Sequence, residues 1–359
     1  MSAIVRSCGG VCLTKIFLDD FGIFLGRKRN RFVVRRNCEK HEFVADDVES
    51  IICTCPGVAL SSSAIELAVK NNIQVVFARY SGWPYAILTP TTISGSVRAR
   101  REQFLAYNDA RGFILAKKFI EGKLKNQANL LKLLAKNRRD TNPILAENLY
   151  RAGKIIDYFY EKLLDGKASN IELARQRLMS LEAEAARAYW SAISQIIPKG
   201  FGFKGRITRG ATDPFNVMLN FGYQVILFPE VWKAIYYAGL DPYAGFLHAD
   251  RPGKPSLVLD LMEEFRQQTI DRILIRLISK KEVKPDEIFA SEGVKGEKRL
   301  LNKNVTEKLI KTLLERLETL VIFGGKRGSL KSFIYSQARV ITRFLIGDVA
   351  DYKPFILGW

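Results

Sequence analysis

The stretch Thr89-Pro90-Thr91-Thr92-Ile93-Ser94-Gly95-Ser96 decides how this sequence is organised, because the hydrophobic pattern changes across it. It combines proline, glycine, serine and threonine, which favour turns and loops over helices and strands. We therefore predict a linker over residues 91–97, between an N-terminal domain (1–90) and a C-terminal domain (98–359). Two domains fit a chain of 359 residues, since a domain commonly has about 100–200 residues.

Short apolar runs characterise the sequence before the linker. Several are rich in β-branched and aromatic residues and are bounded by polar, turn-like residues, as strands are. The predicted strands lie within residues 11–18, 22–25, 32–34, 51–55, 73–78 and 85–88. Ser63, followed three residues later by Glu66, predicts a capped helix over 64–70. The N-terminal part is therefore predicted to be β-rich.

A different period begins after the linker. Over residues 98–196, apolar residues recur at intervals of three and four with charges between them, which is typical of amphipathic helices. The pattern is interrupted by a glycine-rich, basic loop at 199–214 and returns over 216–238, 256–280, 305–323 and 330–345. The sequence thus predicts an α+β fold, in which a small N-terminal β-rich domain precedes a larger all-α-helical domain.

Excess positive charge limits the classes of partner. Lys and Arg number 56 against 37 Asp and Glu, and most of the excess lies beyond residue 90. Such a surface suits a nucleic-acid backbone, although a solvated lysine-rich helical surface with acidic partners would have the same composition. No apolar run reaches the roughly 18 residues of a spanning helix, and Arg6 and Lys15 interrupt the first twenty residues. We expect a cytoplasmic protein with no membrane partner.

The cysteines all lie in the first 55 residues. They are Cys8, Cys12, Cys38, Cys53 and Cys55. An odd number in a reducing compartment argues against a disulfide framework. Cys38 and His41 form a CxxH pair and Cys53 and Cys55 a CxC pair, but neither spacing matches a strong zinc signature. Packing of Cys53 and Cys55 in the core is therefore favoured over a zinc site.

The second of the two histidines stands in a loop that leads into a predicted helix. This segment reads GFLHADRPGKPSLVLDLMEEFR over residues 245–266, with His248 in the loop. Asp260 is flanked by apolar residues, which is costly for an ionised carboxylate unless it is paired or bound to a cation. Glu263 follows Asp260 by three residues, so both lie on one helical face. The imidazole of His248 could fold back onto that face.

A second acidic helix reads LMSLEAEAARAYW over residues 178–190 and places Glu182 beside an apolar stripe. Glu182, His248 and Glu263 together would make a carboxylate–imidazole–carboxylate set. Mixed oxygen and nitrogen ligation suits Mn²⁺ or Mg²⁺, whereas zinc would be expected to show more His or Cys. The alternative is that these acids face solvent or pair with arginines such as Arg187, and that the histidine only forms hydrogen bonds.

These two segments resemble motifs of the CRISPR-associated adaptation integrase, the metal-dependent DNA endonuclease that inserts new spacers into a repeat array. Residues 182–189 are similar to the family's Glu-Gly-x-Ala-Ala-Arg-x-Tyr motif, and 245–266 to its loop-to-helix motif. Residues 209–223 and 61–82 resemble further family segments. Two departures are Ala183 in place of Gly and Glu264 in place of Pro. The choice of Glu263 over Glu264 as a ligand therefore rests on alignment.

The resemblance implies Glu182, His248 and Glu263 as ligands of Mn²⁺ or Mg²⁺, with Asp260 as a supporting catalytic acid. It implies a β domain and a helical catalytic domain, and phosphodiester transesterification by the 3′-OH of spacer DNA on the repeat. The implied partners are double-stranded or branched DNA, a second copy joined through the β domains, and a small ferredoxin-like adaptation protein. The candidate DNA-binding residues are Arg251, Lys254, Arg266, Arg206 and Arg209.

Two other functions fit the same residues. One is a metal-dependent nuclease that acts on branched DNA or RNA and has no role in integration. The other is a basic helical protein that binds nucleic acid without catalysis. A protein that only binds has no reason to gather two carboxylates and an imidazole in apolar surroundings, so integration is the favoured function.

Overall fold

The computed structural model describes residues 4–6, 14–79, 84–89, 96–289 and 301–358. It divides into two compact units. The first unit comprises residues 1–93, 220–229 and 286–318, and the second 94–219, 230–285 and 319–359. Most of the predicted linker and two of the cysteines, Cys8 and Cys12, lie outside the described residues. Within the described parts, no helix has the length and apolar character needed to cross a membrane.

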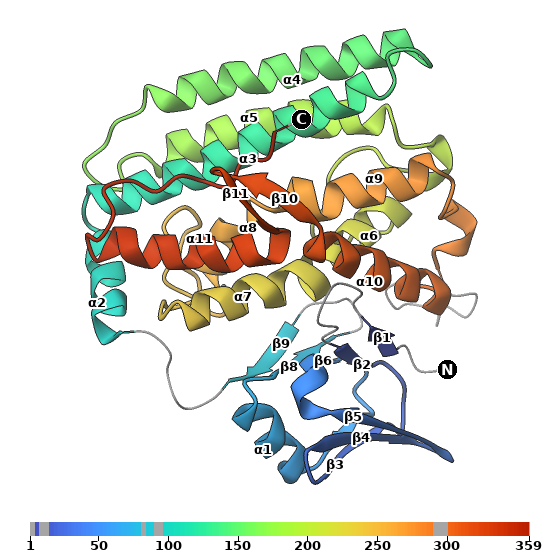
Figure 1. Cartoon of the computed structure of the whole chain (residues 1–359). Coiled ribbons are helices and arrows are strands. Elements are labelled where there is room, and N and C mark those ends of the chain that lie inside the picture. Colours follow the sequence, from blue (N-terminus) through green and yellow to red (C-terminus); the bar gives the residue numbers. More distant parts are fainter. Residues whose placement is uncertain (1–3, 7–13, 80–83, 90–95, 290–300, 359) are drawn as a thin grey trace. The chain divides into compact units, whose positions relative to one another are not determined.

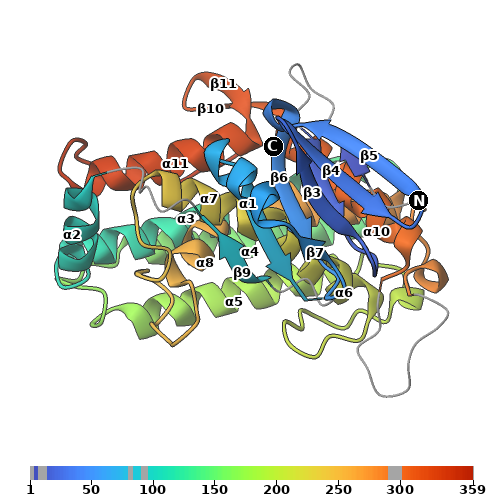
Figure 2. The ribbon, with the colours of Figure 1, turned by 90° about the horizontal axis from the view of Figure 1, so that it is seen from below.

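The first unit contains two sheets (Figures 1 and 2). One has the strand order β1-β2-β6-β8-β9 and the other β5-β4-β3-β7. Their bounds are β1 Ile4–Arg6, β2 Thr14–Leu18, β3 Phe24–Lys28, β4 Arg31–Arg36, β5 Glu39–Val44, β6 Val48–Cys53, β7 Ala59–Leu60, β8 Gln74–Ala78 and β9 Pro84–Leu88. Strands β2, β6 and β8 pair in parallel, and helix α1 (Ser62–Lys70) lies between β7 and β8 in the chain. The β-rich prediction is confirmed.

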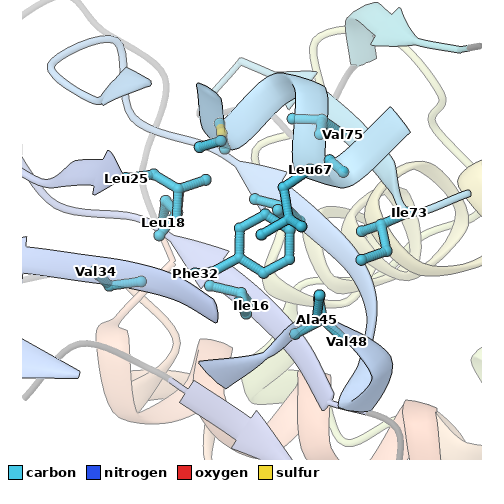
Figure 3. Packing of buried hydrophobic residues seen from close by; sticks show 14 of the residues in the cluster. Ile16, Leu18, Leu25, Phe32, Val34, Ala45, Val48, Leu67, Ile73 and Val75 are labelled. Carbon is cyan, nitrogen blue, oxygen red and sulfur yellow. The ribbon is translucent and has the colours of Figure 1, made fainter. Parts of the chain in front are cut away.

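One hydrophobic core joins the two sheets to α1 (Figure 3). Ile16 and Phe32, one from each sheet, are fully buried there, and Leu67 reaches the same cluster from α1. Cys53 belongs to it as well, and burial raises the pKa of its thiol to about 12. Cys53 and Cys55 are both buried, so the core interpretation of these cysteines is confirmed.

The start of α1 differs from the prediction. Its N-cap is Ser61, whose hydroxyl accepts a hydrogen bond from the amide of Ala64 at 3.2 Å. Ser63 lies within the first turn, and Glu66 forms ion pairs with Arg27 and Lys70 instead of reaching back to a cap. The S-x-x-E spacing therefore identified the helix and misplaced its first residue by two positions.

The second unit is mainly helical. Its helices are α2 Val97–Ala106, α3 Ala110–Lys136, α4 Pro143–Leu164, α5 Arg175–Ser194, α8 Ser256–Met262, α9 Arg272–Ser279 and α11 Leu330–Leu345. Helices α6 (Pro214–Phe221) and α7 (Phe228–Tyr237) continue into each other through a π-helical segment, Gly222–Leu227, which belongs to the first unit together with α10 (Lys303–Glu318). The α+β prediction is confirmed, with helices in all five predicted regions.

One segment of the second unit is not helical as predicted. Helix α10 ends at Glu318, and the chain then forms an antiparallel hairpin of β10 (Leu320–Phe323) and β11 (Lys326–Ser329). Its turn residues, Gly324 and Gly325, both have positive φ, which glycine adopts without steric cost. The two glycines end the helical pattern, so the C-terminal part is not entirely α-helical.

Helix α3 is the central support of the second unit, since it packs against both α4 and α5 (Figure 1). Its N-cap is Asp109, whose carboxylate accepts a hydrogen bond from the amide of Arg111. Near its middle, Gly122 allows a close approach to Glu264: a Cβ atom at residue 122 would lie 2.8 Å from Glu264 Cγ. Because glycine has no side chain, the backbone of α3 can lie next to Glu263 and Glu264, which follow α8.

Candidate active site

Hydrogen bonds join the two ends of the loop that carries His248. Ser256 Oγ donates to the carbonyl of Tyr243 and accepts from the amide of Gly245 at 3.3 Å. A Cβ atom at Gly245 would lie 2.6 Å from the carbonyl carbon of Ser256, so glycine is the residue that fits. Ser256 is the first residue of α8, and no side chain caps this helix.

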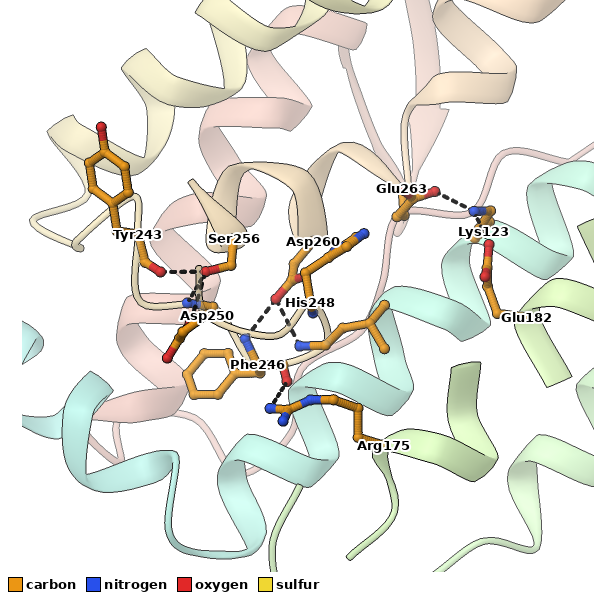
Figure 4. Close-up of polar contacts among 12 residues, drawn as sticks. Lys123, Arg175, Glu182, Tyr243, Phe246, His248, Asp250, Ser256, Asp260 and Glu263 are labelled. Carbon is orange, nitrogen blue, oxygen red and sulfur yellow. Dashed lines mark hydrogen bonds and ion pairs between the residues drawn. The ribbon is translucent and has the colours of Figure 1, made fainter. Parts of the chain in front are cut away.

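Asp260 holds the loop from inside α8 (Figure 4). Its carboxylate is fully buried and accepts hydrogen bonds from the amides of Phe246, Leu247 and His248 at 2.7, 2.9 and 3.0 Å. The Nδ1 atom of His248 lies 2.6 Å from Asp260 Oδ1. A carboxylate at this position selects the tautomer with hydrogen on Nδ1, which leaves Nε2 of His248 available as a ligand or base. The predicted return of the imidazole onto the α8 face is confirmed.

Glu182 and Glu263 meet across one ammonium group. Figure 4 shows Lys123 of α3 between the two carboxylates, with Glu182 on α5 and Glu263 at the end of α8. Lys123 Nζ lies 2.7 Å from Glu263 Oε2 and donates a hydrogen bond to Glu182 Oε1. The side chains are largely withdrawn from solvent, with 12% of Lys123, 17% of Glu182 and 5% of Glu263 exposed.

The charges of this cluster support one another. Burial acts to raise the pKa of Glu263, but the positive charges of Arg266 and Lys123 lower it to about 2. Burial acts to lower the pKa of Lys123, but the negative charges of Glu182 and Glu263 have the larger effect and raise it. Arg266 Nη2 is 3.2 Å from Glu263 Oε1. Glu263 and Lys123 are therefore both charged at neutral pH.

Glu264 has a different environment from Glu263. It is fully buried and accepts hydrogen bonds from the Tyr352 hydroxyl (2.6 Å), the Phe355 amide (2.7 Å) and the Gln337 side chain (3.2 Å). Burial raises the pKa of Glu264 to about 8. The adjacent acids thus face opposite ways: Glu263 points to Lys123 and Glu264 to the segment around Tyr352, a distinction that the sequence left to alignment.

We expect Glu264→Gln and Glu264→Ala to differ sharply in stability. A carboxyl with a pKa of about 8 is mostly neutral at pH 7, so the neutral amide should cost no more than about 1 kcal/mol. Alanine removes the acceptor from three buried donors and should cost about 3 kcal/mol or more. Denaturant unfolding at pH 7 measures both. Equal losses for the two substitutions would contradict this account of Glu264.

Tyr189 fixes the spacing between the two acidic helices. It lies seven residues after Glu182, hence two turns along the same face of α5. Its hydroxyl donates to Asp271 Oδ2 at 2.8 Å, and both residues are fully buried. Asp271 ends a π-helical segment, Gln267–Asp271, that follows the turn bearing Glu263. The pairing of Glu182 with Tyr189 in one motif therefore has a structural reason that sequence reasoning missed.

The predicted DNA-binding residues fall into two groups. Arg209 and Arg251 are exposed, and Lys254 is half-buried near both. Burial lowers the pKa of Lys254, and Arg251 and Arg209 lower it further against the opposing charge of Asp260. Arg206 instead donates to Asn216 Oδ1 at 2.9 Å. Arg266, as described, pairs with Glu263.

Asn216 also explains the segment around it. Its amide group donates to the carbonyl of Gly205 and to Asp213, and its oxygen accepts from the amide of Ile207. Asp213 and Asn216 therefore hold the glycine-rich loop against the start of α6. This is a structural role within the stretch that carried the resemblance.

A cavity of about 560 Å³ lies beside the His248 loop. Arg251 and Lys254 line it from the loop, and Phe104 and Tyr107 line it from α2 and its end. Gln103 fixes its wall: its side chain donates to the carbonyls of Asp241 and Ala244 and accepts from the amide of Asp241. A concave surface with basic groups thus adjoins the loop that carries His248.

Glu182, Glu263 and His248 are the candidate ligands of a metal ion. Among the described residues, no three His, Cys, Asp or Glu side chains lie close enough together to hold one. The chemistry nevertheless fits a divalent cation, because Glu182 and Glu263 already share a positive charge. Glu263 Oε2 is buried against the Lys123 ammonium, and the ring of His248 is oriented by Asp260. Two carboxylates and an oriented imidazole are a usual set for Mn²⁺ or Mg²⁺.

Comparison with known protein families identifies the family of this chain. The model of the family "CRISPR associated protein Cas1" matches residues 16–324. The chain belongs to the Cas1 family. The resemblance drawn from the two motifs is therefore confirmed.

Relatives of the Cas1 family match over nearly the whole chain. CRISPR-associated endonuclease Cas1 1 of Archaeoglobus fulgidus is 39% identical over 351 residues, which are 96% of this chain and 100% of the relative. CRISPR-associated endonuclease Cas1 of Korarchaeum cryptofilum is 30% identical, covering 95% of this chain and 97% of the relative.

Solved structures agree with the Cas1 fold. A casposase bound to its integration product is similar with a TM-score of 0.80 and 25% identity, over 94% of this chain and 93% of the casposase. A Cas1 protein from Thermotoga maritima gives a TM-score of 0.73 and 22% identity, over 96% and 99% of the two chains. The second likeness supports the fold alone.

Proposed function

We propose that this protein is a divalent-metal-dependent DNA endonuclease and integrase of CRISPR adaptation. The observation that carries the proposal is the convergence of Glu182 and Glu263 on one positive charge, beside a histidine held by Asp260, in a Cas1-family chain. The named activities of the relatives and the integration product bound to the casposase support the same reaction.

The reaction is a transesterification at phosphorus. The 3′-OH of spacer DNA forms a new bond to a phosphorus atom of the repeat, and the bond from that phosphorus to the adjoining 3′ oxygen breaks. The attacking hydroxyl loses its proton and the departing oxygen gains one, so the number of phosphodiester bonds is unchanged. Water as the attacking group gives a nick instead.

Each site residue has a role in this proposal. Glu182, His248 and Glu263 would hold Mn²⁺ or Mg²⁺, which supplies a Lewis acid for a phosphate oxygen and lowers the pKa of the attacking hydroxyl. Asp260 keeps the proton on Nδ1 of His248 and so acts as a positioning residue.

Basic residues would bind the DNA backbone. Arg209, Arg251 and Lys254 are accessible for phosphate contacts next to the His248 loop. Arg206 and Arg266 complete the candidate set, and each would exchange a present intramolecular contact for one with DNA. Because phosphate contacts carry no sequence information, DNA shape or a branched junction would select the site.

The proposal includes two protein interfaces. Residues 1–90 would join two copies through their β-rich domains, with 98–359 as the helical catalytic domain. A small ferredoxin-like adaptation protein would complete the assembly. Membership of the Cas1 family supports both interfaces.

The test uses the purified chain, a labelled duplex with free 3′-OH ends and a repeat-containing plasmid. With Mn²⁺ we expect products in which the label is joined to the plasmid, and none after chelation. Products that are cut but never joined would indicate a nuclease without an integration role. Binding of DNA that chelator does not affect, with no cut or joined product, would indicate a protein that only binds.

A further inference from the structure

Lys123 occupies an unusual place for a lysine. Its ammonium group is largely buried and contacts two carboxylates that come from different helices, Glu182 of α5 and Glu263 of α8. A buried positive charge persists only when it is paired in this way. Without it, two carboxylates would face each other in a region with little water, which is unfavourable. The ammonium therefore stabilises the helix arrangement in the absence of any other cation.

The same two carboxylates are those proposed to hold the divalent cation. A carboxylate oxygen that faces an ammonium at 2.7 Å, as Glu263 Oε2 does, is not open to a metal ion at the same time. A second cation would also be repelled by Lys123 and by Arg266, which pairs with the other oxygen of Glu263. Metal binding therefore requires Lys123 to leave.

The side chain of Lys123 can leave while its helix stays in place. The backbone of α3 is fixed against the acidic turn by Gly122, where a Cβ atom would lie 2.8 Å from Glu264 Cγ and 3.1 Å from Pro354 Cβ. Asn126, one turn later, donates to the carbonyls of Glu264 and Phe355. The lysine stem, by contrast, is a flexible four-carbon chain. Rotation of the side chain is the available movement.

We propose that Lys123 is an internal cation that holds the metal-free site together and competes with the divalent ion for Glu182 and Glu263. Lys123 then sets the apparent metal affinity, because each binding event must first displace its ammonium. This inference rests on the proposed function, since it takes Glu182 and Glu263 as metal ligands.

The test compares Lys123→Met with the wild type in Mn²⁺ binding, measured by calorimetry after chelation and dialysis. If the ammonium occupies the site in nine molecules of ten, its removal should tighten binding about tenfold. The chelated variant should also melt at a lower temperature than the chelated wild type, and Mn²⁺ should raise its melting temperature by more. A variant that folds only with Mn²⁺ would support the same inference, because the metal then replaces the ammonium.

Lys132 provides a matched control on the same helix. Its side chain is 11% exposed and its ammonium lies 2.6 Å from Asp157 Oδ2, so Lys132→Met also breaks a partly buried ion pair. It should lower stability without changing Mn²⁺ affinity. Lys123→Arg keeps the charge and should bind Mn²⁺ no more tightly than the wild type.

The outcomes separate this inference from the function on which it rests. If Glu182→Ala weakens Mn²⁺ binding but Lys123→Met binds no more tightly than the wild type, the role of Lys123 is wrong and the metal site stands. If Glu182→Ala leaves Mn²⁺ binding unchanged, the metal site itself is wrong.

Discussion

Glu182→Ala is expected to lower metal-dependent cleavage and strand joining on the order of a thousandfold, while DNA binding stays nearly unchanged. The reason is that one of the proposed metal ligands is lost, while the exposed basic residues beside the His248 loop remain. Initial rates with Mn²⁺ in excess measure the loss, and a filter or mobility assay measures binding.

Glu184→Ala is the control for this substitution. Glu184 lies two residues further along α5 but is exposed, so its loss removes a negative charge from the same helix without touching the cluster. It should retain near-normal rates. Near-normal activity of Glu182→Ala in Mn²⁺ would show that Glu182 is not a ligand.

Asp260→Ala should be the most destabilising single substitution in the site. Its carboxylate accepts from three loop amides and from the ring of His248, and it is fully buried. Each buried donor left without an acceptor costs about 1–3 kcal/mol, so a loss of about 3–5 kcal/mol is expected. Thermal and denaturant unfolding measure it, and strand joining should disappear with the loop conformation.

Asp260→Asn separates the two roles of this residue. Its amide oxygen can still accept from the loop, so the loss of stability should be smaller, but it cannot provide the charge that orients and polarises His248. Mn²⁺ affinity should fall about 10–100-fold. Asp250→Ala, an exposed acid of the same loop, should leave that affinity unchanged. Equal Mn²⁺ affinities for Asp260→Asn and the wild type would remove Asp260 from the site.

The fold was predictable where the spacing of apolar residues and the positions of turn residues indicate the same element boundaries. The change from short apolar runs to three- and four-residue spacing near residue 96 separated strands from helices correctly. The spacing failed at 320–323, because four apolar residues continue a helical pattern as readily as they form a strand. Only the two following glycines, which take positive φ, end the helix there.

The site was predictable in its residue types and only partly in its contacts. An acid among leucines indicates a bound or paired carboxylate, and Asp260 is paired as expected. The choice between Glu263 and Glu264 depends on residues about 90 positions away, which no local pattern contains. Lys123 was missed for the same reason, although the glycine before it was a usable sign of close helix packing.

The distance in sequence between Glu264 and its partners has a consequence for biosynthesis. Its carboxyl is buried by Tyr352 and Phe355, which are 88 and 91 residues further along the chain. A ribosome adds those residues last of all the parts that surround this turn, so the nascent chain cannot bury Glu264 before they emerge. The helices can form early, but the acidic turn that bears Glu263 takes its final surroundings only after Tyr352 and Phe355 have been synthesised.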